Sequence, residues 1–581
     1  MSIINKTKQN ITKKINQAIK ADIAAPENLV YPPREDMGDL SLPCFVLAKN
    51  LGKNPAEIAE FLVKNIKSKG AIASVSALGP YFNIKLNKAE LAKGVINEIE
   101  SLRENYGCNK SGKKQKIMIE YSNANTHKEF HVGHLRNLCY GDSVSRIIAA
   151  NGYKNIPVSY INDFGSHIAK TIWGLIKFYL DDKISDDINS ELEKFSDHEN
   201  KGALLGEIYV RASTAIKEDK TAKQLAELIM KKIETRDGKE YELWQKTREW
   251  SIEQFSKIYN DLGVNFDKIY YESEFIDKGR DIVKELLQKK ILKESQGAVI
   301  ADLEEYGLGV LVVLRSDGTA TYPVADIPLA MKKFKEYSPD ASIYIVDKRQ
   351  ALYFKQLFHI LKSMNYKKPM IHLGYDVVKL PSGMMSSRSG NVITYEELKE
   401  KLYTSAKTET SERHTDWSKE KIDLTVEKLV NGTIKFEMLK VGQEQPITFD
   451  IEKALSFNGF TSVYLQYTYA RIQSILRKQK IGKEKKDIDY SNLAFEKEHK
   501  LILKLAKYPS AVELAGKDFN PSEIARYLFE LAQDFNDYYH EVPILQSDER
   551  TKNARLALIS SVSQVVKNGL ALLGIGVVEE M

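Results

Sequence analysis

Cysteine is scarce in this chain. Its 581 residues include only Cys44, Cys108 and Cys139. Three scattered cysteines are too few for a disulfide framework or a cysteine-rich zinc site. Because such scarcity fits a reducing compartment, we expect a cytoplasmic protein.

Long hydrophobic runs are also missing. The longest apolar stretches, residues 308–314 and 571–578, have the length of buried strands or short core helices. A helix that crosses a bilayer needs about 20 apolar residues. Residues 1–20 interleave lysine with isoleucine at helical spacing and contain no apolar core of the signal-peptide kind. We therefore expect neither export nor membrane insertion.

The chain lacks a strong net charge of either sign. Lysine and arginine number 85 and aspartate and glutamate 79, which leaves a formal charge of +6. This balance permits, but does not require, a nucleic-acid partner bound through local patches. Hydrophobic residues make up 43% and charged residues 28%, which excludes a disordered or fibrous protein. The length suffices for three or four domains.

The first 110 residues predict a small α+β domain. We expect its helices at residues 11–19 and 55–66, and its strands at 71–75 and 81–86. The polar, basic and glycine-containing stretch 109–116 predicts a linker to the next domain.

A β–loop–α–β pattern comes after the linker. Strands are expected at 117–121 and 155–161, with a helix from about His131 between them. The same pattern returns at residues 309–314, 342–346 and 370–373. This order predicts an α/β domain over residues 111–400, whose parallel sheet binds its ligand at the carboxyl ends of the strands.

The rest of the chain reads as helical. The stretch from about residue 181 to residue 288 is rich in lysine and glutamate at helical spacing, and it predicts a helical insertion in the sheet domain. Residues 401–450 are expected to form a connecting stem, and residues 451–581 an all-α domain. From about Asp416 onward we expect helices only.

Two histidines mark the first candidate site, in the segment EYSNANTHKEFHVGH at residues 120–134. His131 and His134 lie one helical turn apart where a strand and loop lead into a helix. They could be structural histidines or half of a metal site, although no further ligands are grouped nearby. They could also form a phosphate site, because a helix N-terminus offers free N–H groups and Gly133 lets a flat adenine approach the backbone.

A second candidate site is the loop PSGMMSSRSGN at residues 381–391. Such a loop can be a mobile surface turn. However, Ser386, Ser387 and Arg388 offer two hydroxyls and a guanidinium, which suit phosphate oxygens.

Together these segments resemble the arginyl-tRNA synthetases. The sequence from His131 to His134 resembles the HIGH signature of class I aminoacyl-tRNA synthetases, and residues 384–388 resemble their KMSKS loop. Further segments resemble the arginine family in the same order: GDLSLPCFVLAKNLGKNPAEIA, GPYFN, YINDFGSHIAK, RSDGTATYPVADIPLA, IYIVDKRQALYF and LQYTYARIQSIL. The resemblance implies a Rossmann-like catalytic domain, an additional N-terminal domain that binds tRNA and a helical anticodon-binding domain.

The resemblance also implies an arginine site. A guanidinium needs a fork of acceptors, and the family pattern gives this role to Tyr322, Asp326 and Gln350. Asp326 could instead only cap a helix N-terminus. The α-amino group is assigned to Glu120 and Asn125. The full arginine-binding set is Glu120, Ser122, Asn125, His167, Tyr322, Asp326 and Gln350, in which His167 departs from the glutamine usual in the family.

ATP binding is implied for the two signature segments. The expected set is Lys128, His131, Gly133, His134, Met385, Ser386, Ser387 and Arg388. The lysines of KMSKS are replaced here by Met384 and Ser387. We expect Lys128 to supply the missing cation with Arg388 as helper, so the catalytic residues would be Lys128, His131, His134 and Arg388. Lys128 could otherwise be an ordinary surface lysine. Mg²⁺ is expected with ATP, and no metal bound by the protein itself.

A basic, tyrosine-containing region predicts the tRNA contact. Arginines and lysines crowd residues 471–486, beside Tyr464, Tyr467 and Tyr469. Such a run can be a solvated face, and the tyrosines can belong to a core. Together they suit phosphate neutralisation and base stacking, and the resemblance points to Gln466, Tyr469 and Arg471. The expected partners are tRNA(Arg), L-arginine and ATP, bound by a monomer.

The implied reaction is arginylation of tRNA in two steps. The arginine carboxylate attacks the α-phosphate of ATP, and a ribose hydroxyl of the terminal tRNA adenosine then attacks the adenylate. Two alternatives stay open. One is a tRNA-binding paralogue without catalysis, which Met384 and His167 would suit; the other is a small-molecule nucleotidyltransferase, against which the helical C-terminal region argues.

Overall fold

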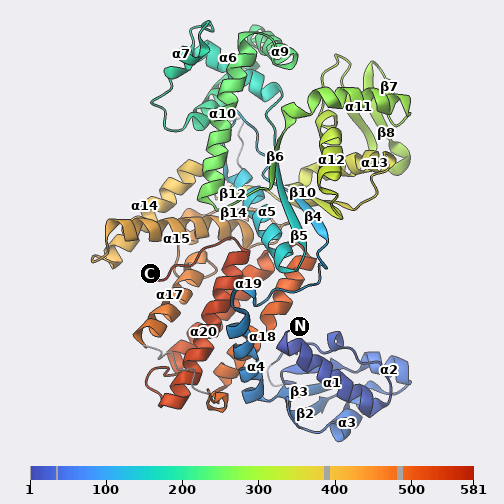
Figure 1. Cartoon of the computed structure of the whole chain (residues 1–581), viewed down its shortest axis with the longest axis vertical. Coiled ribbons are helices and arrows are strands. Elements are labelled where there is room, and N and C mark those ends of the chain that lie inside the picture. The colour runs from blue at the N-terminus through green and yellow to red at the C-terminus, as the bar shows by residue number, and fades with distance from the viewer. Residues whose placement is uncertain (1, 35–36, 382, 385–392, 480–487) are drawn as a thin grey trace.

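The structure is a computed structural model of the whole chain that describes residues 2–34, 37–381, 383–384, 393–479 and 488–581. A small N-terminal domain and a helical C-terminal bundle lie side by side at one end (Figure 1). A parallel sheet lies in the middle, and two groups of helices extend beyond it at the other end. No helix of the described residues is long and apolar enough to cross a membrane.

The N-terminal domain packs helices on a three-stranded antiparallel sheet of order β1-β3-β2. Its elements are α1 (Ile3–Ile19), β1 (Leu40–Pro43), α2 (Phe45–Leu51), α3 (Pro55–Asn65), β2 (Ile72–Leu78), β3 (Tyr81–Leu86) and α4 (Lys88–Leu102). α3 begins after Asn54, whose side chain accepts the Ala56 N–H, with Pro55 in the first turn. The helical and strand segments predicted here are all present, and α1 starts earlier than expected.

The central sheet has five strands, all parallel, in the order β11-β10-β4-β5-β6. They are β4 (Lys116–Glu120), β5 (Lys154–Ile161), β6 (Lys268–Tyr271), β10 (Ala341–Asp347) and β11 (Met370–Tyr375). The chain runs outward from β4 in one direction through β5 and β6, and from β10 to β11 in the other. Ligands bind where such an order reverses, at the carboxyl ends of the strands. The predicted parallel-sheet fold is confirmed.

One predicted strand belongs to a different sheet. Residues 309–314, expected in the parallel sheet, form β9 (Gly309–Leu314) of a small antiparallel sheet with β7 (Lys293–Ser295) and β8 (Ala298–Leu303). The connection from β8 to β9 holds only five residues, too few for the crossover that parallel neighbours need. Conversely, β6 was not among the predicted strands.

Helices surround the two sheets. α5 (Val132–Ala150) follows β4, and α11 (Ile276–Gln288), α12 (Pro323–Tyr337) and α13 (Ala351–Ser363) lie near the small sheet (Figure 1). The predicted helical insertion, residues 181–288, also contains strand β6 of the parallel sheet and helix α11; its other helices are α7 (Ile188–Glu193), α8 (Lys201–Glu218), α9 (Lys220–Thr235) and α10 (Gly238–Asp261). They pack on α6 (Ser166–Tyr179) around an apolar core of their own that includes Ile168, Leu205 and Leu243.

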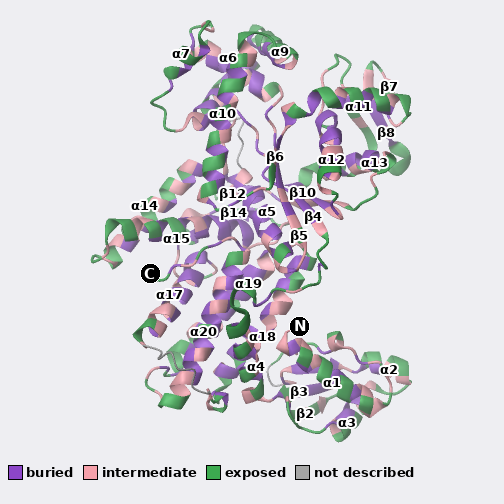
Figure 2. Cartoon of the chain, viewed as in Figure 1, coloured by how far each residue is buried: buried purple, intermediate pink, exposed green. Residues whose placement is uncertain are grey.

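The C-terminal third is a helical bundle joined to the sheet by two long helices. α14 (Tyr395–Arg413) and α15 (Lys419–Leu439) make the connection, followed by α16 (Ile451–Ala454), α17 (Ser462–Lys478), α18 (Glu496–Lys517), α19 (Ser522–Glu541) and α20 (Glu549–Leu572). Buried residues line the inward faces of these helices (Figure 2). The expectation of helices alone after Asp416 misses β14 (Ile447–Thr448), which pairs with β12 (Val378–Leu380), itself paired with β13 (Gly383–Met384).

Short 3₁₀ helices complete the chain: η1 (Pro26–Asn28), η3 (Arg103–Asn105), η4 (Glu272–Glu274), η5 (Glu304–Tyr306), η6 (Lys348–Gln350) and η7 (Tyr490–Asn492). η4 and η6 follow β6 and β10 directly, so both lie at the carboxyl edge of the parallel sheet.

Candidate active site

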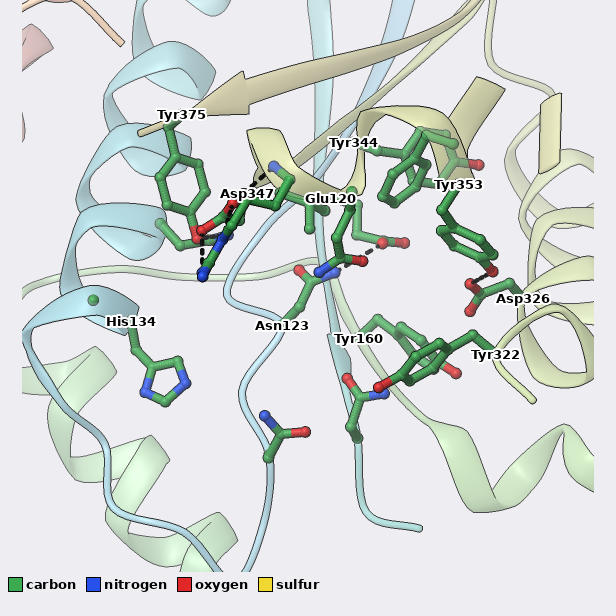
Figure 3. Close-up of a pocket in the computed structure, with 18 of the residues that line it drawn as sticks. Glu120, Asn123, His134, Tyr160, Tyr322, Asp326, Tyr344, Asp347, Tyr353 and Tyr375 are labelled. Carbon is green, nitrogen blue, oxygen red and sulfur yellow. Dashed lines mark hydrogen bonds and ion pairs between the residues drawn. The ribbon is translucent and has the colours of Figure 1, made fainter. Parts of the chain in front are cut away.

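A cavity of about 670 Å³ opens at the carboxyl edge of the parallel sheet, where β4 and β10 end. Eight of the predicted site residues line it: Glu120, Asn125, His131, Gly133, His134, Tyr322, Asp326 and Gln350. Figure 3 shows the His134 ring at one end, Asp326 beside Tyr353 at the other, and Glu120 between them. The structure therefore gathers residues that lie up to 230 positions apart.

The two histidines build the first turn of α5. The Nδ1 atom of His131 accepts the Gly133 N–H at 3.1 Å, and that of His134 accepts the His131 N–H at 3.2 Å. Their rings stack with centroids 4.0 Å apart. An imidazole whose Nδ1 accepts carries its proton on Nε2 when it is neutral. Each ring therefore keeps an N–H donor available beyond the helix N-terminus.

Both histidines are held neutral. Burial, with the nearby Lys128 charge, lowers the pKa of His131 to about 4. Burial, with His131 and Lys128, holds the pKa of His134 well below its usual range. At neutral pH the pair therefore donates hydrogen bonds without adding charge, as suits positioning of a phosphate oxygen.

Lys128 lies close to the histidines but outside the cavity lining. Its ammonium sits over the Tyr209 ring, 4.8 Å from the centroid, and its charge is felt by both imidazoles. The side chain is half-buried. The contact of Lys128 with a phosphate group stays a prediction.

The opposite end of the cavity is acidic and lined with tyrosines. Asp326, in the first turn of α12, accepts the hydroxyl of Tyr353. Burial raises the pKa of Asp326 to about 6. The Tyr160 hydroxyl is buried with no hydrogen-bond partner among the described residues, and Tyr322 stands at the mouth, 64% exposed. This end offers acceptors to a planar cation.

Glu120 forms the middle of the cavity wall at the end of β4. Its carboxylate accepts from Asn123 at 3.2 Å and forms a buried ion pair with Lys333. Asp326 does lie in the first turn of a helix, as the alternative reading of this residue expects, but its side chain also lines the same cavity as Glu120.

Two predicted arginine contacts lie away from the cavity wall. The Ser122 hydroxyl donates to Tyr259 at 2.9 Å, and its backbone, at φ +60°, is tied to Asn137. His167 lies in the first turn of α6. Its Nε2 atom is buried and unpaired within the described residues, and burial holds its pKa well below the usual range. Ser122 shapes the loop that carries Asn123 and Asn125, whereas the structure gives His167 no contact with the cavity.

Several residues of this site were missed. Glu272 on η4 is not a lining residue but contacts one: its carboxylate accepts the Asn162 amide at 3.0 Å, and burial, with repulsion from Asp326, raises its pKa to about 8. Asn162, Tyr160, Lys333 and Tyr353 line the cavity. Recognition of β6 as a strand would have pointed to Glu272, since polar residues directly after parallel strands face the site edge.

The residues predicted at the second signature loop follow strand β12. Met385, Ser386, Ser387 and Arg388 lie outside the described residues. The strand that leads to the loop is firmly held, because Arg136 on α5 donates to the carbonyls of Asp376 and Val377 at 2.8 and 3.2 Å.

The predicted tRNA residues lie on α17. Gln466 is fully buried and donates to the Gly576 carbonyl at 2.9 Å. The Tyr469 hydroxyl donates to Glu579 at 2.9 Å. The half-buried Arg471 donates to Asn536 at 2.8 Å and lies over the Tyr467 ring. A contact of Gln466 or Tyr469 with RNA would require these side chains to leave their internal partners.

Family comparisons match almost the whole chain. Residues 5–86 match the family described as arginyl tRNA synthetase N terminal domain, residues 96–450 that of tRNA synthetases class I (R), catalytic domain, and residues 465–581 that of the DALR anticodon binding domain. The chain is similar to the arginine–tRNA ligase of Bdellovibrio bacteriovorus, with 37% identity over 96% of both chains. It is equally similar to that of Clostridium acetobutylicum, at 37% over 99% of this chain and 100% of the relative.

Solved structures agree with this fold. The arginyl-tRNA synthetase of Thermus thermophilus superposes with a TM-score of 0.79 and 26% identity, covering 99% of this chain and all of the other. That of Plasmodium falciparum gives a TM-score of 0.75 at 22% identity over the full length of both, which supports the fold alone.

Proposed function

Because the chain belongs to the arginyl-tRNA synthetase family, and so charges tRNA(Arg) with arginine through an arginyl-adenylate, we propose that the adenylate forms in the cavity between His134 and Asp326. The observation that supports this most is the arrangement of charge: neutral N–H donors at one end, a carboxylate in the middle and a second carboxylate at the other end. Membership of this family also excludes the two alternative functions named in the sequence analysis, a small-molecule nucleotidyltransferase and a tRNA-binding paralogue without catalysis.

Arginine fits this arrangement in one direction. Its guanidinium is placed at Asp326, with Tyr322 and Gln350 at the rim, and its α-ammonium at Glu120 and Asn125. The α-carboxylate then faces the histidines, where ATP would bind against the N-terminus of α5. The adenine ring would approach the backbone at Gly133; a side chain at this position would also displace the His131 ring, which it would meet.

The chemistry depends on this placement. An oxygen of the arginine carboxylate attacks the α-phosphorus, the bond to the β-phosphate oxygen breaks, and pyrophosphate leaves. A ribose hydroxyl of the terminal adenosine then attacks the carbonyl carbon and releases AMP. His131 and His134 hold phosphate oxygens as negative charge spreads during the displacement. The class I resemblance implies the 2′-hydroxyl for the second step.

The missing KMSKS lysine leaves a need for a cation near the departing pyrophosphate. We assign this role to Lys128, with Arg388 and the hydroxyls of Ser386 and Ser387 as further phosphate contacts beside Met385. Mg²⁺ would enter with ATP and neutralise its phosphates. The resemblance adds that activation of arginine requires bound tRNA.

The tRNA is proposed to contact the N-terminal domain, residues 1–110, and the helical domain, residues 451–581. The stem 401–450 would join the latter to the catalytic unit, residues 111–400. Arg471 is the predicted contact that best keeps a surface location, and Gln466 and Tyr469 stay in the proposal as residues that shape this face. We propose a cytoplasmic monomer, in line with three free thiols in the described residues.

Asp326→Asn tests the guanidinium assignment. Asparagine keeps the size but removes the charge, so the KM for arginine should rise by roughly 30- to 1,000-fold while the KM for ATP changes little, because charge-assisted hydrogen bonds are lost. Tritiated arginine charged onto tRNA measures both. Asp317→Asn, in an exposed turn, is the matched control.

The pH profile gives a second readout for the same residue. A guanidinium binds the ionised carboxylate, and Asp326 has a pKa raised to about 6, so the wild-type KM for arginine should fall by about tenfold from pH 5 to 7. Asp326→Asn should lose that fall. Native arginine affinity in the variant, or an unchanged slope, would place the guanidinium elsewhere.

A further inference from the structure

Lys333 is a buried cation in the cavity wall that the reaction outlined above does not use. It lies on α12, and its side chain is 2% exposed. Its ammonium pairs with Glu120. The rings of Tyr344 and Tyr270 lie 5.1 and 5.9 Å from it, respectively. A carboxylate and two aromatic faces therefore fix this lysine in place.

Glu120 depends on that partner for its charge. Its side chain is 4% exposed, and its other hydrogen-bond contact is the neutral amide of Asn123. A carboxylate buried without a cation takes up a proton, since burial disfavours the charged form. Within the described part of the chain, Lys333 is the cation at ion-pairing distance from Glu120.

The spacing along α12 places this pair at a useful distance from Asp326. Lys333 follows Asp326 by seven residues, or two helical turns, which is roughly 10 Å along the axis. The side chain of an extended arginine, from guanidinium carbon to α-carbon, covers roughly 6 Å. Figure 3 shows Glu120 between Asp326 and His134. From this order and these lengths we expect an arginine held at Asp326 to bring its α-ammonium near Glu120.

Glu120 also has acceptor capacity left. A carboxylate offers about four lone-pair directions, of which Asn123 and Lys333 take two. We propose that Lys333 is a positioning residue for arginine: it keeps the Glu120 carboxylate ionised and turned into the cavity, where that carboxylate accepts the α-ammonium of the substrate. This inference rests on the proposed function, which gives Glu120 that role.

The other titratable groups around the pair leave its charge balance intact. Tyr270 donates its hydroxyl to Glu336 at 2.9 Å, and the Lys332 ammonium lies 5.7 Å from the centroid of the same ring. Burial raises the pKa of both Tyr270 and Tyr344, so both stay neutral. Burial lowers the pKa of Lys333 to about 7, whereas the ion pair with the Glu120 carboxylate favours the charged ammonium. In the absence of Lys333, none of these neighbours replaces its charge.

The first experiment compares Lys333→Met with Lys335→Met. Both remove a lysine from α12, but Lys335 is exposed. Lys333→Met should raise the KM for arginine by roughly 10- to 100-fold, the scale of a lost charge-assisted contact, with the KM for ATP within twofold of wild type. Lys333→Arg keeps the cation and should recover most of the affinity. Arginine charging measures each constant, and circular dichroism checks folding.

The pH profile separates positioning from a general loss of structure. In Lys333→Met the orphaned Glu120 carboxyl should ionise only at raised pH. The ratio of the variant KM for arginine to that of wild type should therefore fall between about pH 7 and 8.5. A ratio that stays constant over this range contradicts the proposal.

Glu120→Gln completes a double-mutant cycle and covers the case in which Lys333→Met does not fold, because the pair Glu120→Gln with Lys333→Met buries no charge. Lys333→Met should raise the KM for arginine when Glu120 is present and leave it unchanged when Glu120→Gln is already in place. An equal rise in both backgrounds, or no rise in either, overturns the role of Lys333. Native arginine affinity in Glu120→Gln alone would instead refute the α-ammonium assignment in the proposed function.

Discussion

At the scale of single residues, the site works through groups whose charge the fold has set in advance. The two imidazoles are neutral because burial and Lys128 disfavour their protonation, and their Nδ1 atoms are already used in the turn. Only the Nε2–H of each ring is left for a ligand. Such fixed donors cost no reorganisation during the displacement, which is where preorganised hydrogen bonds have their largest effect.

His134 has two roles that substitutions can separate. Asparagine places an acceptor near the position of Nδ1 but has no group at Nε2, so His134→Asn should keep the helix turn and lose the phosphate donor. We expect its arginine-dependent pyrophosphate exchange, measured with tRNA present, to fall by about 10²-fold. His134→Ala should lose as much activity and also about 1 kcal/mol of stability from the cap.

The exposed His540 provides the control, since His540→Ala should leave exchange and melting temperature unchanged. Exchange at the native rate in His134→Asn would mean that the ring contributes only to the fold of the turn.

At the scale of elements, the site depends on where each strand ends and on the residues that come directly after it. His131, Gly133 and His134 were found from the sequence because they are contiguous and begin a helix. Glu272 was not, because β6 is only four residues long and comes after a lysine- and glutamate-rich helical stretch. Residues 309–314 were assigned to the wrong sheet, because an apolar run predicts a strand but neither its neighbour nor its burial: Val310 and Val312 are 45% and 40% exposed.

Arg136 links three elements around the site. Its guanidinium is 1% exposed and donates to the carbonyls of Asp376 and Val377, before β12, and of Gly442 and Gln443, before β14. Burial lowers its pKa to about 10, so it stays charged at neutral pH. Arg136 thereby holds both strands of the β12–β14 pair against α5, the helix whose first turn contains His131 and His134.

Arg136→Lys should weaken this junction although the charge is kept. An ammonium has three donors and no planar fork, so at least one carbonyl loses its partner, at a cost of about 1–3 kcal/mol. We expect a lower melting temperature and a kcat for pyrophosphate exchange reduced by roughly tenfold, with the KM for arginine little changed. Arg280→Lys, at a half-exposed ion pair with Glu234, is the control. If Arg136→Lys has the melting temperature and kcat of the wild type, the hydrogen bonds to the four carbonyls contribute nothing measurable to stability or to catalysis.

At the scale of the whole molecule, the sequence predicted the class of each part but not how the parts join. The parallel sheet and the helical C-terminal region follow from the spacing of apolar residues. The contacts between domains do not, because they depend on single polar groups far apart in sequence. The Tyr106 hydroxyl donates to the Leu505 carbonyl at 2.9 Å, and the Nε2 atom of His499 lies 2.8 Å from the Oδ1 atom of Asp39. The same reason hid Lys333, whose partner Glu120 lies 213 residues away.

Asn568 on α20 makes the clearest of these contacts between domains. Its buried amide donates to the carbonyls of Arg103 and Tyr106, at 2.7 and 3.2 Å, where the N-terminal domain ends. Asn568→Ala leaves two carbonyls without this donor, of which that of Tyr106 is buried, so we expect a loss of about 1–3 kcal/mol and faster proteolysis near residues 103–116. If both domains hold the tRNA, the KM for tRNA should rise several-fold while the KM for arginine stays the same.

The control is Asn553→Ala, at a partly exposed position on the same helix, which should change neither stability, nor proteolysis, nor either KM. Equal protease resistance of the two variants would show that the N-terminal domain is held in place by its other contacts.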